Sequence, residues 1–292
     1  MHAANICGNR SVQQRIVTEM STNTEIAVKT ADLTRAFGRF VAVDRVSIEV
    51  HKGEIFGFLG ANGAGKTTVI RVLCGLLRPT SGSATVAGFD VYTRSEQIKR
   101  NIGYMSQKFS LYEDLTVGEN IDFYGGIYGL TQEQIRKKEE EVFTSFGLGT
   151  YARTLTASLP LGFKQRLALG CAMLHDPPIL FLDEPTSGVD PKARREFWDI
   201  IHQTSEKGTT ILVTTHFMEE AEYCHRILIM DAGRIVALDT PHNLKKLHGK
   251  ESVQDVFVTL VRKEIERRRE DEDKAAGRKE TEVRKDTEGR HG

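Results

Sequence analysis

The chain has 292 residues, of which 39% are hydrophobic and 27% are charged, so it can bury a large core without disulfide or metal support. Its 40 basic and 40 acidic residues balance, and no nucleic-acid partner is expected, since domains that bind nucleic acid usually carry a basic excess. It contains no run of about 18 apolar residues, which indicates that the chain does not itself span a bilayer.

In the N-terminal third of the chain, the sequence pattern predicts short strands around one glycine-rich loop. Residues 1–25 are polar without a clear period and are expected to form a flexible leader. Apolar alternation, and then an apolar run that ends in glycine, predict strands at residues 26–33, 41–50 and 54–60. Residues 67–77 have helical spacing, and Pro79 is expected to end that helix. Two further strands are expected at residues 83–87 and 102–105.

The middle of the chain changes character and then returns to alternation of strands and helices. Helical spacing predicts an insertion over about residues 109–175, with helices at 119–128, 132–146 and 161–175. After it, strands are expected at 179–182, 209–214, 226–230 and 234–238, with helices at 193–206 and 218–224. This order predicts an α/β fold with a largely parallel sheet covered on both faces, and an antiparallel β portion before it.

The division of the chain follows from these segments. We expect one domain over residues 26–247, between the leader and a charged extension at 248–292 that is partly helical or disordered. The cysteines form no CxxC pair and no close set with histidine, which favours reduced and mostly buried thiols at Cys7, Cys74, Cys171 and Cys224.

A glycine-rich loop carries the strongest chemical signal. Its sequence, GANGAGKT, fits the phosphate-binding pattern G-x-x-x-x-G-K-[ST], and it lies between a predicted strand and a predicted helix. Glycines let backbone N–H groups turn toward phosphates, the helix N-terminus favours negative charge, Lys66 adds a cation, and the Thr67 hydroxyl can bind Mg²⁺. The predicted nucleotide-binding residues are Gly60, Ala61, Asn62, Gly63, Ala64, Gly65, Lys66, Thr67 and Thr68.

Two acids end the apolar strand predicted at residues 179–182. Asp183 is expected to hold Mg²⁺ beside the phosphate loop, because an acid at the tip of a neighbouring buried strand can reach a metal bound there. Glu184 can then point at an attacking water and act as the general base. ATP and Mg²⁺ are therefore the expected cofactors.

In this setting the chain resembles the ABC ATPase family over about residues 26–247. The segment EPTSGVD at 184–190 resembles the family's strand end running into its D-loop, VTTH ends in the switch histidine His216, and Gln107 resembles the Q-loop glutamine. The resemblance implies that His216 contacts the γ-phosphate and the water, and that Gln107 binds Mg²⁺ and senses a membrane partner. It also implies that Phe37 stacks on adenine, although a core phenylalanine is the plain alternative.

The family's signature segment is altered in this chain. Where the family has Leu-Ser-Gly-Gly, the sequence has Leu159-Pro160-Leu161-Gly162. In the family this segment covers the γ-phosphate held by a second subunit, so the resemblance implies a head-to-tail homodimer or heterodimer in which Gly162 supplies an amide. Proline offers neither a hydroxyl nor an N–H, which weakens one contact, although it suits the first turn of a helix.

The resemblance also implies integral membrane permease subunits, with this chain peripheral on the cytoplasmic face of the membrane. The altered signature and the TTHFMEEAE run resemble the drug-export branch. Aromatic residues after Gln107 are expected either to receive a permease helix or to form the core of the insertion: Phe109, Tyr112, Phe123, Tyr124 and Tyr128. The alternatives are a non-transport ABC ATPase acting on a macromolecular complex, and an ATP-binding regulator that does not hydrolyse.

Overall fold

A six-stranded sheet forms the centre of the molecule in a computed structural model that describes residues 25–107 and 111–267. Its strands run in the order β10-β9-β3-β8-β7-β6, and all neighbours are parallel except the β9–β10 hairpin. The strands are β3 (Ile55–Leu59), β6 (Ile102–Met105), β7 (Ile179–Asp183), β8 (Thr210–Thr215), β9 (Arg226–Asp231) and β10 (Arg234–Asp239). The expected largely parallel sheet is confirmed.

Alternate residues of these strands enter two separate cores, one on each face of the sheet. In β7, Leu180 and Leu182 join one core, while Ile179 and Phe181 join the other. Burial of both faces explains why β3, β7 and β8 are buried along their whole length and why β3 and β7 have nearly continuous apolar sequences.

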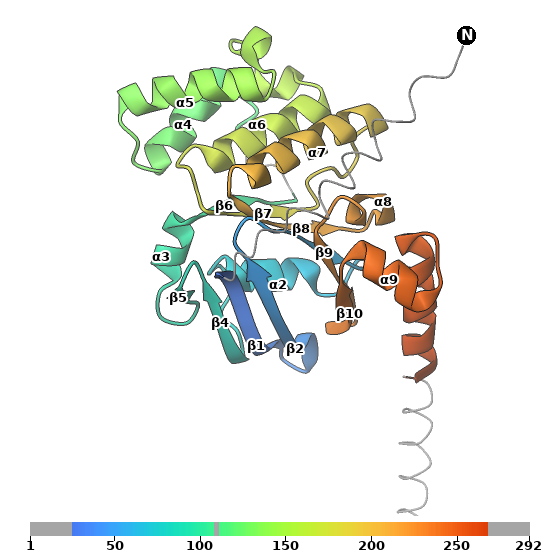
Figure 1. Ribbon diagram of the computed structural model, residues 1–292. Coiled ribbons are helices and arrows are strands. Elements are labelled where there is room, and N and C mark those ends of the chain that lie inside the picture. The colour runs from blue at the N-terminus through green and yellow to red at the C-terminus, as the bar shows by residue number, and fades with distance from the viewer. Residues whose placement is uncertain (1–24, 108–110, 268–292) are drawn as a thin grey trace, which may run out of the picture.

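One core lies under a layer of helices, drawn above the sheet in Figure 1. Its main helices are α4 (Val117–Ile127), α5 (Gln132–Ser145), α6 (Leu161–Met173) and α7 (Pro191–Glu206). Capping boxes begin α4 at Thr116 and α5 at Thr131, and Asp190 caps α7, which starts at a proline. The helical insertion predicted before residue 175 is therefore present.

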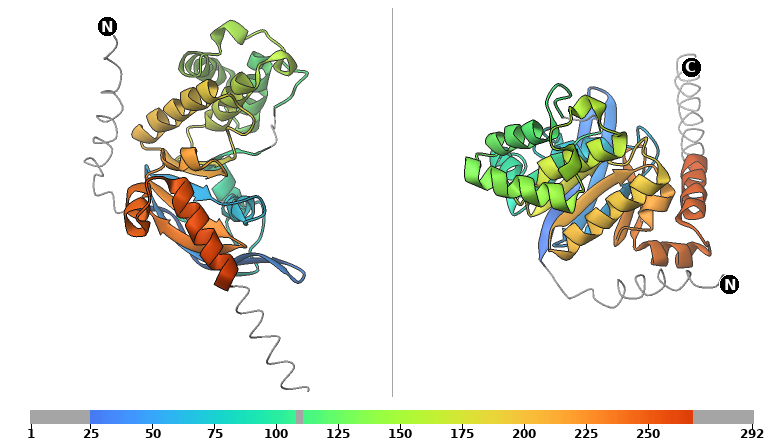
Figure 2. Two further views of the ribbon diagram at one scale, coloured as in Figure 1. Left: turned by 90° about the vertical axis from the view of Figure 1, so that its right-hand side faces the viewer. Right: turned by 90° about the horizontal axis from the view of Figure 1, so that it is seen from above.

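The other core lies between the central sheet and a four-stranded antiparallel sheet of order β2-β1-β4-β5. Helix α2 (Lys66–Leu73) is enclosed between them, and the side view of Figure 2 separates this part of the molecule from the helical layer. The antiparallel strands are β1 (Ile26–Phe37), β2 (Phe40–His51), β4 (Ser81–Val86) and β5 (Phe89–Asp90). The antiparallel β portion predicted from the sequence is thus confirmed.

Several boundaries differ from those predicted. Helix α2 ends at Leu73 rather than at residue 77, because Gly75 adopts a left-handed backbone conformation with φ of 69°, so Pro79 is not what ends it. Helix α8 (Met218–Ala221) is shorter than expected. The sequence interpretation missed β5, α3 (Ser95–Arg100) and α9 (Pro241–His248), while the helical residues 253–267 fall within the extension that was expected to be partly helical or disordered.

Some expectations fall outside the described residues. The leader at 1–24, Cys7, Phe109 and the charged tail from residue 268 lie there, so the division into leader, domain and extension stays a prediction. Cys74, Cys171 and Cys224 are free and buried, and burial raises their pKa values. Among the helices described, none has the length and apolar character needed to cross a membrane.

Candidate active site

The glycine-rich loop connects β3 to α2 at the carboxyl edge of the parallel strands. A Cβ at Gly60 would lie 2.5 Å from the Met230 carbonyl oxygen, and one at Gly65 would lie 2.5 Å from that of Ala42. Gly65 also has a φ of 102° and precedes α2 without any side-chain cap. The first N–H groups of α2 are therefore available to an anion, which is the arrangement predicted from the sequence.

Lys66 lies inside this loop with only 4% of its surface exposed. Its ammonium group donates to the carbonyl oxygens of Gly60 at 2.7 Å and Ala61 at 3.2 Å, and it is 3.7 Å from the Glu184 carboxylate. Burial lowers the pKa of Lys66, an effect that the neighbouring carboxylates oppose. A buried cation enclosed by oxygen acceptors is suited to bind phosphate oxygens in their place.

Asp183 and Thr67 meet at the tips of β7 and α2. The Thr67 hydroxyl donates to Asp183 Oδ1 at 3.0 Å, and the Thr214 hydroxyl donates to the same oxygen at 2.6 Å. A hydroxyl beside a buried carboxylate is a set of hard oxygen donors, and Mg²⁺ prefers such sets when nucleotide phosphates complete its coordination. These residues fit a Mg²⁺ site that forms with the nucleotide.

Glu184 follows directly and is the meeting point of the candidate catalytic groups. Its φ of 50° is unusual for a residue other than glycine, and its N–H donates to the Thr214 hydroxyl at 2.9 Å. Gln107 Nε2 donates to Glu184 Oε2 at 3.1 Å, and His216 Nδ1 lies 3.1 Å from that same oxygen. The structure thus brings the residues Glu184, Gln107 and His216 together beside Lys66, with Gln107 bonded to the glutamate rather than to Asp183 or Thr67.

This arrangement can bind a triphosphate and activate a water. Lys66 and the α2 amides offer positive potential, while Glu184 is a nearly buried carboxylate with a histidine and an amide holding one of its oxygens. Its other oxygen faces Lys66, where the terminal phosphate would be held. A carboxylate in that position can take a proton from a water that attacks phosphorus.

Phe37 lies at the end of β1 and is 47% exposed, so it is not a core phenylalanine. The Arg35 guanidinium is 4.5 Å from the ring centroid. Phe37 pairs with Phe40 in the β1–β2 hairpin, whose Ala42 closely approaches Gly65. An exposed ring on the hairpin beside the loop is compatible with base stacking, which stays a prediction.

Gly162 lies apart from these groups, in the first turn of α6. A Cβ there would lie 2.9 Å from Ala193 Cβ, so the glycine is needed for close packing of α6 on α7. Pro160 is the N-cap residue rather than part of the first turn, and Leu161 is 38% exposed. Within the described residues, no hydrogen bond joins Gly162 to the loop of its own chain, and its contact with a second subunit stays a prediction.

The sequence interpretation missed Thr214, which positions both acids. Its hydroxyl donates to Asp183 and accepts from the Glu184 N–H. Parallel pairing of β7 with β8 sets Asp183 opposite Thr214, so the signal was the polar residue that ends the next strand. The residues Thr186, Arg194, Thr215 and Glu220, which form a buried polar cluster nearby, were also missed.

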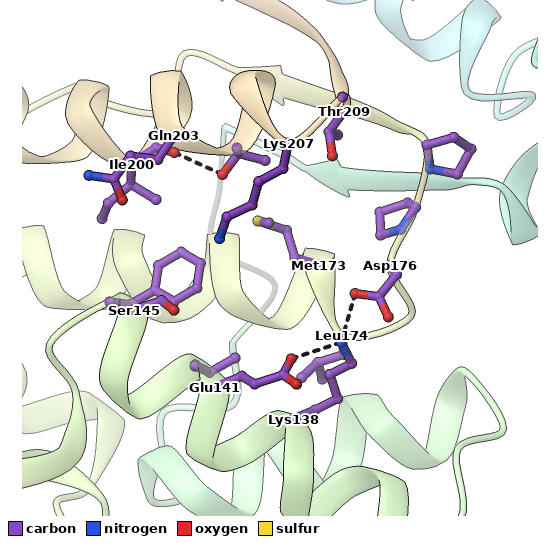
Figure 3. Close-up of a pocket in the computed structure, with 16 residues that line it drawn as sticks. Lys138, Glu141, Ser145, Met173, Leu174, Asp176, Ile200, Gln203, Lys207 and Thr209 are labelled. Atoms are coloured by element: carbon purple, nitrogen blue, oxygen red, sulfur yellow. Dashed lines mark hydrogen bonds and ion pairs between the residues drawn. The ribbon is translucent and has the colours of Figure 1, made fainter. Parts of the chain in front are cut away.

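A cavity of about 410 Å³ opens elsewhere, between α5 and the ends of α6 and α7. Figure 3 shows Lys207 extending across it, with Lys138 paired to Glu141 and Asp176 at one side. None of the sequence-predicted site residues lines it. Its size therefore does not mark the site, which is identified by the chemistry of the groups around the loop.

Comparison with known proteins shows which family this chain is similar to. A family model described as "ABC transporter" matches residues 43–187. The chain is 50% identical over 242 residues to the probable multidrug ABC transporter ATP-binding protein YbhF of Escherichia coli (strain K12), covering 81% of the chain and 42% of that protein's length. It is 36% identical to the linearmycin resistance ATP-binding protein LnrL of Bacillus subtilis (strain 168), covering 79% of the chain and 74% of the relative.

Solved structures agree in fold. An ATP-binding subunit of an ABC transporter superposes with a TM-score of 0.73 at 28% identity, covering 80% of this chain and 99% of the other. A dimeric ATP-binding cassette in a post-hydrolysis state with ADP and Pi gives a TM-score of 0.66 at 25% identity, covering 73% and 98%. The observed sheets and helical layer are therefore those of known ATP-binding cassettes.

Proposed function

The chain belongs to the ABC transporter family, and on that premise we propose that it binds and hydrolyses ATP to drive export through separate membrane subunits. The observation that carries the proposal is the convergence of Lys66, Glu184 and His216 at the tips of three neighbouring strands. Relatives named for multidrug transport and linearmycin resistance support export as the direction. The chain spans 42% of the length of the first of these, so the activity of any larger assembly is part of the proposal.

Each residue has a distinct task in the proposed reaction. The loop amides and Lys66 bind the β- and γ-phosphates, exchanging the carbonyl contacts of Lys66 for phosphate oxygens. Thr67 and Asp183 would hold Mg²⁺, which neutralises charge on the phosphates. Glu184 takes the proton of the attacking water, while Gln107 and His216 hold its carboxylate in place.

The γ-phosphate needs a second protomer to enclose it. Within one chain the α6 N-terminus and Gly162 have no hydrogen bond to the loop among the described residues, yet family resemblance assigns that segment to a phosphate. We infer that two protomers associate head to tail, so that the α6 of each faces the loop of the other. A solved dimeric cassette with ADP and Pi supports this arrangement.

The altered signature is expected to limit turnover. Replacing Pro160 by serine and Leu161 by glycine together should raise the steady-state ATPase rate about tenfold, since a hydrogen bond to a charged group contributes roughly 1.5–3 kcal/mol. The serine would also cap α6, whose N-cap proline makes no side-chain bond. The measurement is phosphate release at saturating Mg-ATP; an unchanged rate would mean that this segment does not limit hydrolysis.

Permease subunits are the proposed membrane partners, with the chain peripheral on the cytoplasmic face. Tyr112 and Phe123 are exposed at 43% and 39%, and their rings pack edge to face at 4.5 Å. Tyr124 and Tyr128 instead pack against the helical-layer core. The exposed pair supports a docking role and the partly buried pair supports a core role, so these four aromatic residues divide between the two interpretations.

The proposal is tested by phosphate release from the purified chain. With Mg-ATP the chain should hydrolyse ATP, and chelation of Mg²⁺ should stop the reaction, because without the metal the phosphate charge is not neutralised and the Asp183 carboxylate beside it adds a further negative charge. Addition of excess Mg²⁺ should restore the original rate, which controls for unfolding. A chain that binds Mg-ATP without releasing phosphate at any protein concentration would instead be the non-hydrolysing regulator.

A further inference from the structure

A buried carboxylate behind the site has no assigned role. Glu220, in the short helix α8, is 0% exposed, and a charge buried this completely must be held by several partners. Thr186 donates to Glu220 Oε1, the Thr215 hydroxyl donates to Oε2 at 2.7 Å, and Arg194 Nε lies 3.3 Å from Oε1. We call these four residues the Glu220 cluster.

The members of the cluster come from segments that border the catalytic groups. Thr186 lies two residues after Glu184, and Thr215 immediately precedes His216. The Glu220 carboxylate therefore connects the segment that follows Glu184 to strand β8, which ends just before His216. The Thr215 hydroxyl also accepts from the Phe217 N–H at 2.9 Å, so both sides of His216 are fixed through it.

Arg194 extends the cluster in two directions. Its guanidinium lies 4.0 Å from the centroid of Phe217, whose ring is 4.2 Å from that of His216. Its Nη2 donates to the Val189 carbonyl at 3.4 Å, in the loop between Glu184 and α7. The cluster thus holds the loop that follows the base as well as the ring beside the histidine.

We propose that Glu220 is a positioning residue for hydrolysis, which sets His216 against Glu184 and couples the loop at residues 186–189 to that pair. This inference rests on the proposed ATPase function. The His216–Glu184 contact of 3.1 Å depends on two loops whose relative position the Glu220 cluster fixes. Displacement of the histidine by about 1 Å can cost up to roughly a hundredfold in rate.

Glu220→Gln is the test variant because it keeps the shape and breaks the hydrogen-bond pattern. A carboxylate accepts on both oxygens, whereas a carboxamide places a donor on one side. One orientation sets that donor against the Arg194 guanidinium, which cannot accept. The other makes the Thr215 hydroxyl accept from the carboxamide, so that it no longer donates to residue 220 while it accepts from the Phe217 N–H. Either way the bonding pattern that holds one arm of the cluster is changed. We expect kcat to fall roughly ten- to a hundredfold while KM for ATP stays within about threefold, because Lys66 and its loop are untouched.

Glu54→Gln is a matched control far from the reaction. Glu54 is also buried, at 5% exposed, with its carboxylate 2.9 Å from Arg226 and that guanidinium over Phe56. It precedes β3, at the opposite end of the sheet from the loop. Both variants should lower the melting temperature, but Glu54→Gln should keep its kcat when assayed below the transition.

A double-mutant comparison separates positioning from general damage. If Glu220 acts through His216, then Glu220→Gln combined with His216→Ala should be no slower than His216→Ala alone. Rate losses that multiply would overturn the positioning role, as would an unchanged kcat in Glu220→Gln. Thr215→Val is the second variant, for use if Glu220→Gln fails to fold. It removes the Thr215 bond and keeps the pair of Glu220 with Arg194, and it should lower kcat in the same manner. A wild-type chain that hydrolyses no ATP would overturn the proposed function first.

Discussion

Replacing Glu184 by glutamine is expected to lower the ATPase rate by about a hundred- to ten-thousandfold while ATP binding is retained. The carboxamide is nearly isosteric but cannot take a proton from water, and a general base contributes factors of this size. The Lys66 ammonium and the α2 amides remain in place, so the triphosphate keeps its main contacts. Loss of the negative charge 3.7 Å from Lys66 should, if anything, favour the anionic nucleotide.

Single-turnover phosphate release and equilibrium ATP binding measure these two effects separately. Glu141→Gln is a suitable control, because that carboxylate lies on the surface of α5 and pairs with Lys138. It should hydrolyse ATP at the wild-type rate. If Glu184→Gln kept more than about a tenth of the wild-type rate, another group would have to be the base.

Replacing Lys66 by alanine is expected to weaken ATP binding at least about tenfold and to abolish measurable hydrolysis. A charge-assisted hydrogen bond from a buried ammonium contributes roughly 1.5–3 kcal/mol, and each 1.4 kcal/mol corresponds to about tenfold in affinity. In the described part of the chain, no other lysine or arginine lies within ion-pair distance of Glu184, so no neighbouring cation replaces the lost charge.

Calorimetric titration with Mg-ATP measures the affinity of the Lys66→Ala chain. Lys99→Ala is the matched control, because Lys99 pairs with Glu96 on the surface of α3 and its loss should leave the affinity unchanged. Equal dissociation constants for wild type and Lys66→Ala would show that the loop is not where the triphosphate binds.

Much of the fold was predictable because local pattern and tertiary environment agree. The runs at residues 54–60 and 179–182 predict buried strands, and both lie between two neighbouring strands of a sheet that is covered on each face. Helix α3 was missed because only Ile98 among its residues is buried, which leaves no apolar period to detect. The helix predicted over residues 67–77 extends beyond the observed end of α2, because Gly75 rather than Pro79 ends the helix.

The candidate site, too, was predictable from the sequence only in part. Gly60, Gly65 and Lys66 lie within one loop, so their spacing in the sequence is enough to predict their role. Thr214 and Glu220 act through register and contacts between distant segments: Glu220 bonds Thr186 across 34 positions of the chain. No local pattern encodes such a pairing. Gln107, 77 positions from Glu184, was singled out only by family resemblance, which predicted a bond to Mg²⁺ and not this contact with the glutamate.

The central claim is that the site is completed by a second protomer, and the mass of the Glu184→Gln chain in solution tests it most directly. With Mg-ATP, sedimentation should show a particle of twice the protomer mass, because hydrolysis can no longer reopen the interface. Without nucleotide, or with the added Lys66→Ala change, the same chain should sediment as one protomer. A Glu184→Gln chain that binds Mg-ATP yet stays at one protomer mass at high concentration would contradict the composite site.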